Sequence, residues 1–364
     1  MSTLHKIALT FIKSIGPVNA KNLLAYCGSA EAVFSATRKQ LLQIPGIGEK
    51  TVEAILKTDA LERAKEELDF IEKHGIEVLF FSDENYPKRL KNCFDAPILL
   101  YFKGSVDLNH KRIISIVGTR NATEYGRMLC KQLCEVLAAY DVLIVSGLAY
   151  GIDVTTHKEC LLNNIATVGV LGHGLDRLYP QIHKPVAQKM VLNGGLISEF
   201  PTKTNPDRQN FPQRNRIIAG IADATIVIEA SIKGGALITA EIANSYNKDV
   251  YAFPGRTNDI FSEGCNFLIK TNRAGLINNA NDLIYYLGWD DEVKNKKAKT
   301  QTTLQLNLTA NEQKVVDALQ SGQLSIDELA IAVNIQQSKL AIILLTLEMQ
   351  GIIISMPGKV YKLA

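Results

Sequence analysis

The chain has 364 residues, of which 46% are hydrophobic and 21% are charged, and its formal net charge is +3. This length provides for two or three domains of a soluble globular protein, and the small net charge permits a nucleic-acid partner without requiring one. No apolar run approaches the roughly 20 residues that span a bilayer and no export signal is found, so we expect a cytoplasmic protein with no membrane partner.

The first region, residues 1–60, reads as short helices separated by glycine turns. Two of these turns, Ile15-Gly16-Pro17 and the IPGIGEK segment at residues 44–50, look like helix-hairpin-helix motifs. The glycines of such a hairpin leave amides free at a helix start, where a phosphate can bind without being read for sequence. Such motifs also serve as packing or protein-contact modules, and both interpretations stay open for this helical domain.

The second region, residues 61–290, alternates strands with helix-length segments. Its short apolar runs lack the polar alternation of a half-exposed strand, which indicates a parallel sheet buried on both faces. The βαβ alternation predicts a Rossmann-like, doubly wound α/β domain. The expected strands are residues 113–117, 142–145, 167–171, 196–198, 225–228 and 250–253.

Small and basic residues follow these strands, and the carboxyl ends of parallel strands meet at the edge of the sheet where ligands bind. Glycine backbone and helix N-termini favour an anion, arginine and lysine add charge-assisted contacts, and an aromatic ring offers a surface on which a base can stack. We therefore predict a binding site for single-stranded DNA. Its predicted residues are Gly118, Thr119, Arg120, Ser146, Gly147, Arg208, Phe211, Arg214, Asn215, Arg216, Lys233, Gly234 and Gly235.

Several other site chemistries are not supported by the sequence. The segment after the first predicted strand is GTRNATEYG rather than G-x-G-x-x-G, which argues against a dinucleotide enzyme. No C-x-x-C pair is present among the six cysteines, and neither His157 nor His173 has a partnered nucleophile beside it. We expect reduced thiols, no metal, no cofactor and no catalytic residue.

The polar, lysine-rich stretch at residues 291–303 has the composition of a linker. The last region, residues 304–364, predicts a winged helix with helices at 310–320, 326–333 and 336–350 and strands at 351–355 and 359–363. Its expected recognition helix carries Lys339 as the one cation, so we expect a protein-contact or accessory role rather than sequence-specific DNA recognition.

Six ordered blocks of the central region closely resemble the DNA-processing protein A family, also called DprA or Smf. The blocks are IVGTR at residues 116–120, SGLAYGID at 146–153, GHGLDRLYP at 172–180, FPQRNRIIAG at 211–220, EASIKGGALITA at 229–240 and GCNFLI at 264–269.

The resemblance implies a recombination mediator that protects incoming single-stranded DNA and loads the RecA recombinase during natural transformation. It implies that Arg120, beside Gly118, grips a phosphate, and that Arg208 and Phe211 are the second basic position and the base-stacking aromatic. It also implies a homodimer, whose interface would lie near Cys265, Leu268 and Ile269.

An enzyme is the alternative. The GGALITAE segment at residues 234–241 partly matches the PGGxGTxxE signature of nucleoside-monophosphate phosphoribohydrolases. The match departs at Lys233, where proline is expected, and at Leu237, where glycine is expected. Glu241 is more simply a solvated helix residue, so the non-enzymatic interpretation is preferred.

Overall fold

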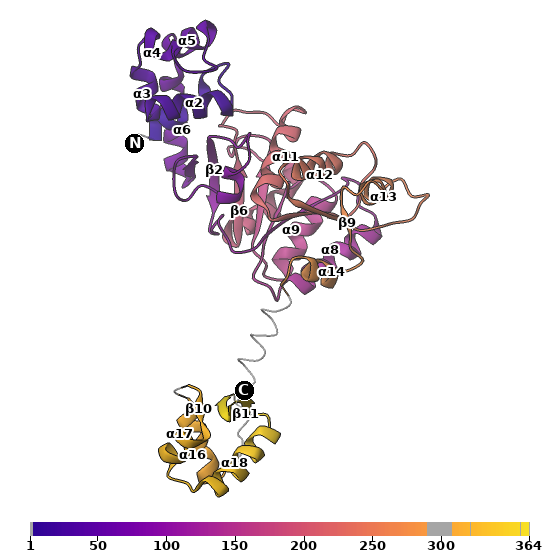
Figure 1. The fold of residues 1–364 in the computed structure, drawn as a ribbon. Coiled ribbons are helices and arrows are strands. Elements are labelled where there is room, and N and C mark those ends of the chain that lie inside the picture. The colour runs from indigo at the N-terminus through magenta and orange to yellow at the C-terminus, as the bar shows by residue number, and fades with distance from the viewer. Residues whose placement is uncertain (1–2, 290–307, 321, 357, 364) are drawn as a thin grey trace. The chain divides into compact units, whose positions relative to one another are not determined.

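The computed structural model describes residues 3–289, 308–320, 322–356 and 358–363 (Figure 1). The chain divides into two compact units, Met1–Asp291 and Glu292–Ala364, and each is described by itself. The linker predicted at residues 291–303 lies outside the described residues.

The first unit begins with a bundle of short helices. Glycine in the left-handed region ends two of them, with Gly28 at φ 84° and Gly75 at φ 59°. The apolar core of the bundle includes Val52 and Ile71 and continues into the first two strands of the sheet, through Phe80 and Tyr101. The helices are α1 (Thr3–Phe11), α2 (Pro17–Cys27), α3 (Ala30–Ser35), α4 (Arg38–Leu42), α5 (Glu49–Leu56) and α6 (Ala60–His74).

A nine-stranded sheet follows, in the order β1-β2-β6-β5-β4-β3-β7-β8-β9. The strands from β6 to β9 run parallel, while β1 and β2 form an antiparallel pair that joins β6. The bounds are β1 (Glu77–Phe80), β2 (Leu99–Gly104), β3 (Ile113–Val117), β4 (Leu143–Ser146), β5 (Thr167–Leu171), β6 (Gly194–Ser198), β7 (Ala224–Val227), β8 (Asp249–Ala252) and β9 (Gly275–Leu276).

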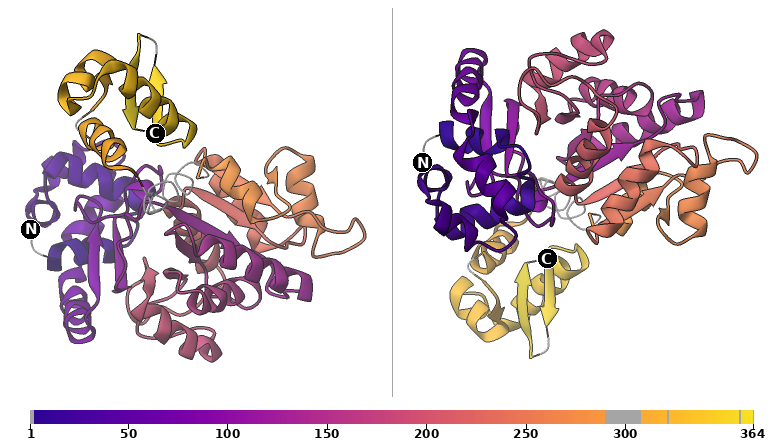
Figure 2. Two further views of the ribbon diagram at one scale, coloured as in Figure 1. Left: turned by 90° about the horizontal axis from the view of Figure 1, so that it is seen from below. Right: turned by 90° about the horizontal axis from the view of Figure 1, so that it is seen from above.

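Helices cover both faces of this sheet, as the views in Figure 2 show. One apolar cluster packs α8 (Glu124–Leu137), α9 (Ile152–Leu162) and α14 (Ala280–Tyr286) on the sheet. A second cluster packs α7 (Lys88–Lys91), α11 (Asn210–Ile221), α12 (Gly235–Ser245) and α13 (Glu263–Lys270) on it. A third joins α10 (Lys184–Leu192), which follows the 3₁₀ turn Gln181–His183, to β5 and β6. The predicted Rossmann-like fold is confirmed.

The strand order changes direction between β3 and β7. The chain moves outward from β3 through β4 and β5 to β6, then returns through α11 to β7 on the other side of β3. In an open parallel sheet, such a switch point leaves a crevice beyond the carboxyl ends of the two strands. The fold therefore places a ligand site where Gly118 follows β3 and the 228–234 segment follows β7.

The second unit is the predicted winged helix, with α16 (Ala310–Leu319), α17 (Ile326–Val333) and α18 (Gln337–Met349) packed on a sheet of order β10-β12-β11. The strands are β10 (Leu324–Ser325), β11 (Ile353–Met356) and β12 (Val360–Leu363). Among the residues that the structure describes, no single helix is long and apolar enough to cross a membrane, and one sharply bent pair, α17 with α18, satisfies that test by length and composition alone.

Candidate nucleic-acid interface

A cavity of about 690 Å³ opens at the switch point between β3 and β7. Most of the residues predicted from the sequence line it, although they come from three separate segments of the chain. The predicted residues in the lining are Gly118, Thr119, Arg120, Arg208, Phe211, Arg214, Asn215, Lys233, Gly234 and Gly235. Gly147 lines a smaller cavity that shares Arg120, Phe211 and Arg214 with the first.

The loop after β3 is held firmly, which fixes the place of Arg120. The amide of Thr119 donates to the carbonyl oxygen of Glu229 at 2.7 Å, and its carbonyl oxygen accepts from the amide of Ile152 at 3.1 Å. A Cβ atom on Gly118 would lie 2.4 Å from the Ile152 side chain, so only glycine allows this approach. The exposed Arg120 side chain extends from a rigid turn into the cavity lining.

Phe211 lies among cations at the start of α11. The guanidinium carbon of Arg120 is 5.4 Å from the centre of the ring, and that of Arg214 is 6.0 Å away. The ring of Tyr179 lies 6.3 Å from it at an angle of 46°. An aromatic ring beside two cations can stack a nucleic-acid base while the cations bind the adjoining phosphates.

Arg214 is the deepest cation of the cavity, with 4% of its surface exposed. Within the described part of the chain, its buried Nε and Nη1 atoms have no hydrogen-bond partner. Burial lowers the pKa of its guanidinium to about 10, an effect that the neighbouring Asp153 opposes, so the group stays positive at neutral pH. Burial also raises the pKa of Asp153, and Arg214 opposes that shift. An anionic ligand would compensate this incompletely paired charge.

The start of α12 forms another part of the cavity lining. Gly234 is its N-cap and supplies no side-chain hydrogen bond, so the first amides of this 11-residue helix face the cavity without a cap. The exposed Lys233 precedes it, and the Asn215 side chain donates to the carbonyl oxygen of Gly235 at 3.4 Å. A helix N-terminus beside a lysine favours a bound phosphate.

Two predicted residues, Ser146 and Arg216, line neither of these cavities. The Ser146 hydroxyl is buried and donates to the carbonyl oxygen of Ile116 at 2.6 Å. The Arg216 guanidinium is ion-paired with Glu199 and also contacts the backbone of Asp95. Arg214 and Arg216 are two positions apart on a helix, and side chains at that spacing leave the helix in different directions.

The predicted dimer contacts lie mostly inside the domain. Cys265 and Leu268 are 1% and 0% exposed and belong to the core beneath α13, so neither side chain is available to a second copy. Ile269 is partly buried against the same core. At a spacing of three and four residues, these positions share the face of α13 that packs on the core.

Asp153 and Tyr179 are among the lining residues that were not predicted. Asp153 lies in the first turn of α9, after the loop that follows β4, and Tyr179 lies in the loop that follows β5. The Tyr179 amide donates to His173 Nε2 at 3.2 Å, while His173 Nδ1 lies 2.9 Å from the Gly174 carbonyl oxygen. The signal for both was their position after a parallel strand, the same criterion that selected the other residues.

The enzyme alternative has less support from the geometry. Glu241 lies on the exposed side of α12, where its Oε1 is 2.9 Å from Nη1 of Arg273. Among the described residues that line the cavity, Asp153 is the only carboxylate, and it is held between the Ala149 amide and Arg214. The described residues also contain no cluster of His, Cys, Asp and Glu side chains able to hold a metal ion.

Comparisons with known proteins match all three parts of the chain. The model of the DNA recombination-mediator protein A family matches residues 77–288, a SAM-like helix-hairpin-helix tandem matches 6–58, and a DprA winged helix domain matches 298–359. Protein Smf of Synechocystis is 35% identical over 289 residues, which is 78% of this chain and 72% of that protein. A putative DNA processing protein DprA of Mycobacterium tuberculosis is 31% identical over 80% of this chain and 78% of its own length.

Two solved structures resemble the fold. The X-ray structure of DNA processing protein A from Streptococcus pneumoniae matches with a TM-score of 0.67 and 29% identity, covering 78% of this chain and 98% of that one. A structure of DNA processing protein A from Helicobacter pylori, described for its single-stranded DNA binding mode, matches with a TM-score of 0.54 and 30% identity. It covers 59% of this chain and 96% of its own.

Proposed function

This chain belongs to the DNA recombination-mediator protein A family, and from that premise we propose that it binds single-stranded DNA in the cavity at the switch point, without catalysing a reaction. The observation that carries the proposal is the Phe211 ring, which lies within 6.0 Å of the Arg120 and Arg214 guanidinium carbons. A single strand offers unpaired bases for the ring and phosphates for the cations.

The preference for a single strand follows from this arrangement. In a duplex the bases are stacked on one another and are not free to leave the helix for Phe211 without a cost of a few kcal/mol per base. The cations grip phosphates of either form, so the discrimination comes from the ring. The single-stranded DNA binding mode described for the Helicobacter pylori relative supports this assignment.

The wider role that we propose is mediation of recombination during natural transformation, in the cytoplasm, with RecA as the protein partner and a homodimer as the acting form. These parts rest on the family. Because Cys265 and Leu268 are buried, a homodimer must use other surface, and Ile269 is the one predicted contact that is partly exposed.

Binding of a fluorescently labelled oligo-dT, measured by anisotropy across a salt series with a duplex competitor, tests the proposal. We expect tight binding that the duplex competes for poorly and that weakens as salt rises, with a slope that counts the phosphates engaged. Absence of binding at low salt would overturn it. Release of free base from a nucleoside monophosphate, measured in parallel, would instead support the phosphoribohydrolase alternative.

A further inference from the structure

A buried carboxylate joins the helical bundle to the loop that carries Arg208. Glu67, on α6, is 1% exposed. Its Oε1 and Oε2 accept hydrogen bonds from the amide of Thr202 at 2.9 and 3.1 Å, and Oε2 also accepts from the Thr202 hydroxyl. Thr202 belongs to the loop between β6 and α11, so one side chain of α6 binds both the backbone and the side chain of this loop.

Arg63 completes the junction one helical turn earlier. Its Nη2 lies 2.9 Å from Glu67 Oε2 and contacts the carbonyl oxygen and hydroxyl of Thr202 at 2.9 and 2.8 Å. The guanidinium also lies over the Phe11 ring, 5.0 Å from its centre, which ties the junction to α1. We call the contacts among Arg63, Glu67 and Thr202 the α6 latch.

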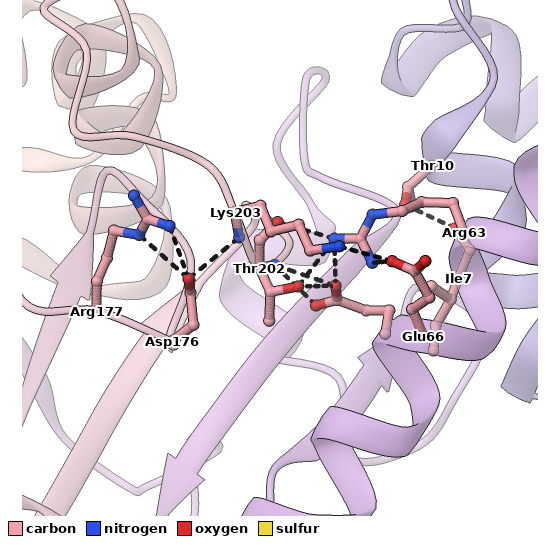
Figure 3. A network of polar contacts seen from close by, with 9 residues as sticks. Ile7, Thr10, Arg63, Glu66, Asp176, Arg177, Thr202 and Lys203 are labelled. Carbon is pink, nitrogen blue, oxygen red and sulfur yellow. Dashed lines mark hydrogen bonds and ion pairs between the residues drawn. The ribbon is translucent and has the colours of Figure 1, made fainter.

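The next residue of the loop is held from two sides. The Lys203 ammonium donates to Glu66 Oε2 at 2.7 Å, and its amide donates to Asp176 Oδ2 at 3.2 Å (Figure 3). Lys203 has a φ of 67°, a conformation that a lysine adopts only where its surroundings impose it. A Cβ atom on Gly174 would lie 2.3 Å from the Pro201 carbonyl oxygen, so the two loops touch backbone to backbone.

The segment of the loop held by these contacts leads directly into the residues that line the cavity. Arg177, which is paired with Asp176, also bonds to the side chain of Asn205, and the next residues, Pro206 and Arg208, line the cavity. Arg208 itself is exposed, and within the described residues its guanidinium has no hydrogen bond, ion pair or ring contact. Its position therefore depends on the path of the loop, which is held first at Thr202 and then at Lys203 and Asn205.

We propose that Glu67 is a positioning residue for DNA binding: the α6 latch holds the 201–209 loop so that Arg208 faces the cavity, which makes the helical bundle part of the DNA site. The inference rests on the proposed function and deepens it. Glu67 touches no DNA and acts through Thr202 on the direction of the loop.

The direction in which Glu67→Gln changes DNA affinity separates a positioning role from a long-range effect of the Glu67 charge. Removing a negative charge from a protein that binds a polyanion strengthens binding when the charge acts at long range. The latch predicts the opposite for Glu67→Gln, because the released loop no longer presents Arg208. Glu72→Gln, on the exposed surface of the same helix, is the matched control for the charge change.

The experiment measures oligo-dT affinity and its salt dependence for the full chain and for Glu67→Gln, Glu72→Gln, Arg208→Ala and the Glu67→Gln/Arg208→Ala double variant. We expect Arg208→Ala and Glu67→Gln each to weaken binding about tenfold and to reduce the salt slope by about 0.7, the value for one phosphate on a single strand. The double variant should bind like Arg208→Ala alone, while Glu72→Gln should bind as tightly as the unmodified chain or slightly tighter.

A second pair of variants covers the case in which the buried substitution prevents folding. Thr202→Val removes the hydroxyl that Glu67 and Arg63 contact, whereas Thr202→Ser keeps it. Loss of affinity in Thr202→Val with rescue in Thr202→Ser supports the latch, and equal affinity in the two variants overturns it.

The outcomes keep the two proposals apart. If the unmodified chain fails to bind oligo-dT, or Arg208→Ala binds as well as it does, the cavity assignment itself fails. If Arg208→Ala is weakened but Glu67→Gln binds like the control, or the two effects add in the double variant, the cavity stands and the latch is wrong.

Discussion

A Cβ atom added to Gly147 would lie 1.6 Å from Nη1 of Arg214, so the buried guanidinium occupies the space that any other residue would need. Gly147→Ala should therefore displace Arg214 from the cavity and weaken oligo-dT binding, and the overpacking should lower the free energy of unfolding by roughly 1–3 kcal/mol. Affinity by anisotropy and urea denaturation measure the two effects.

A second background tests whether the loss of stability in Gly147→Ala comes from the clash with Arg214. In an Arg214→Ala background the space is free, so Gly147→Ala should cost much less stability there than in the unmodified chain. If Gly147→Ala lowers the free energy of unfolding equally in the two backgrounds, Gly147 is required for a reason other than the space that Arg214 occupies.

Arg120→Ala should weaken oligonucleotide binding strongly and by nearly the same factor for all sequences, because a phosphate contact reads no base. Its salt slope should fall by about 0.7 for each phosphate of a single strand that the variant no longer neutralises. Lys131→Ala, at an exposed position on α8 beyond the cavity lining, is the charge-matched control. An affinity unchanged by Arg120→Ala would remove Arg120 from the site.

Phe211→Ala should cost roughly 1–3 kcal/mol of binding free energy, which is the contribution of one base stacked on an aromatic ring. Most of the salt dependence should remain, because the cations are still present. Phe211→Tyr keeps the ring and should bind nearly as well. A steep loss of salt dependence in the alanine variant would mean that the ring supports the cations rather than a base.

His157 predicts a pH dependence of stability. Burial, with smaller contributions from Arg214 and His183, lowers the pKa of its imidazole to about 3. Because the unfolded pKa is about 6.5, the unfolded chain binds the extra proton between these values, and stability falls as pH decreases through that window. The loss attributable to this residue is about 2 kcal/mol at pH 5.

Urea denaturation at pH 7 and pH 5 measures this effect, with His157→Asn as the comparison. The unmodified chain should lose about 2 kcal/mol more than the variant between the two pH values. Equal losses in both proteins would show that His157 does not control the acid sensitivity.

Much of the site followed from position in the sequence, because the residues after each parallel strand must meet at one edge. Arg120, Phe211 and Lys233 come from three separate segments of the chain and line one cavity, as that rule requires. Position after a parallel strand predicts where a loop lies but does not predict the direction of each side chain. It therefore could not separate Arg214, which enters the cavity, from Arg216, which pairs with Glu199.

Contacts between distant parts of the chain were harder to predict. The antiparallel strands β1 and β2 lie in a segment interrupted by Pro87 and Pro97. The pairing of β2 with β6 depends on residues about 100 positions away. The α6 latch is also a contact between distant parts of the chain, because Glu67 and Thr202 are 135 positions apart. No local pattern in the sequence marks Glu67 as buried on the helix.

The most direct test of the DNA site is photocrosslinking with an oligonucleotide that carries 5-iododeoxyuridine, a base that links to aromatic rings stacked on it, followed by tryptic mapping. We expect a crosslinked peptide of residues 209–214, released by cleavage after Arg208 and Arg214, with the link at Phe211. Its yield should fall in Phe211→Ala. Crosslinks confined to residues 6–58 or to the winged helix, with none in residues 209–214, would contradict the central claim.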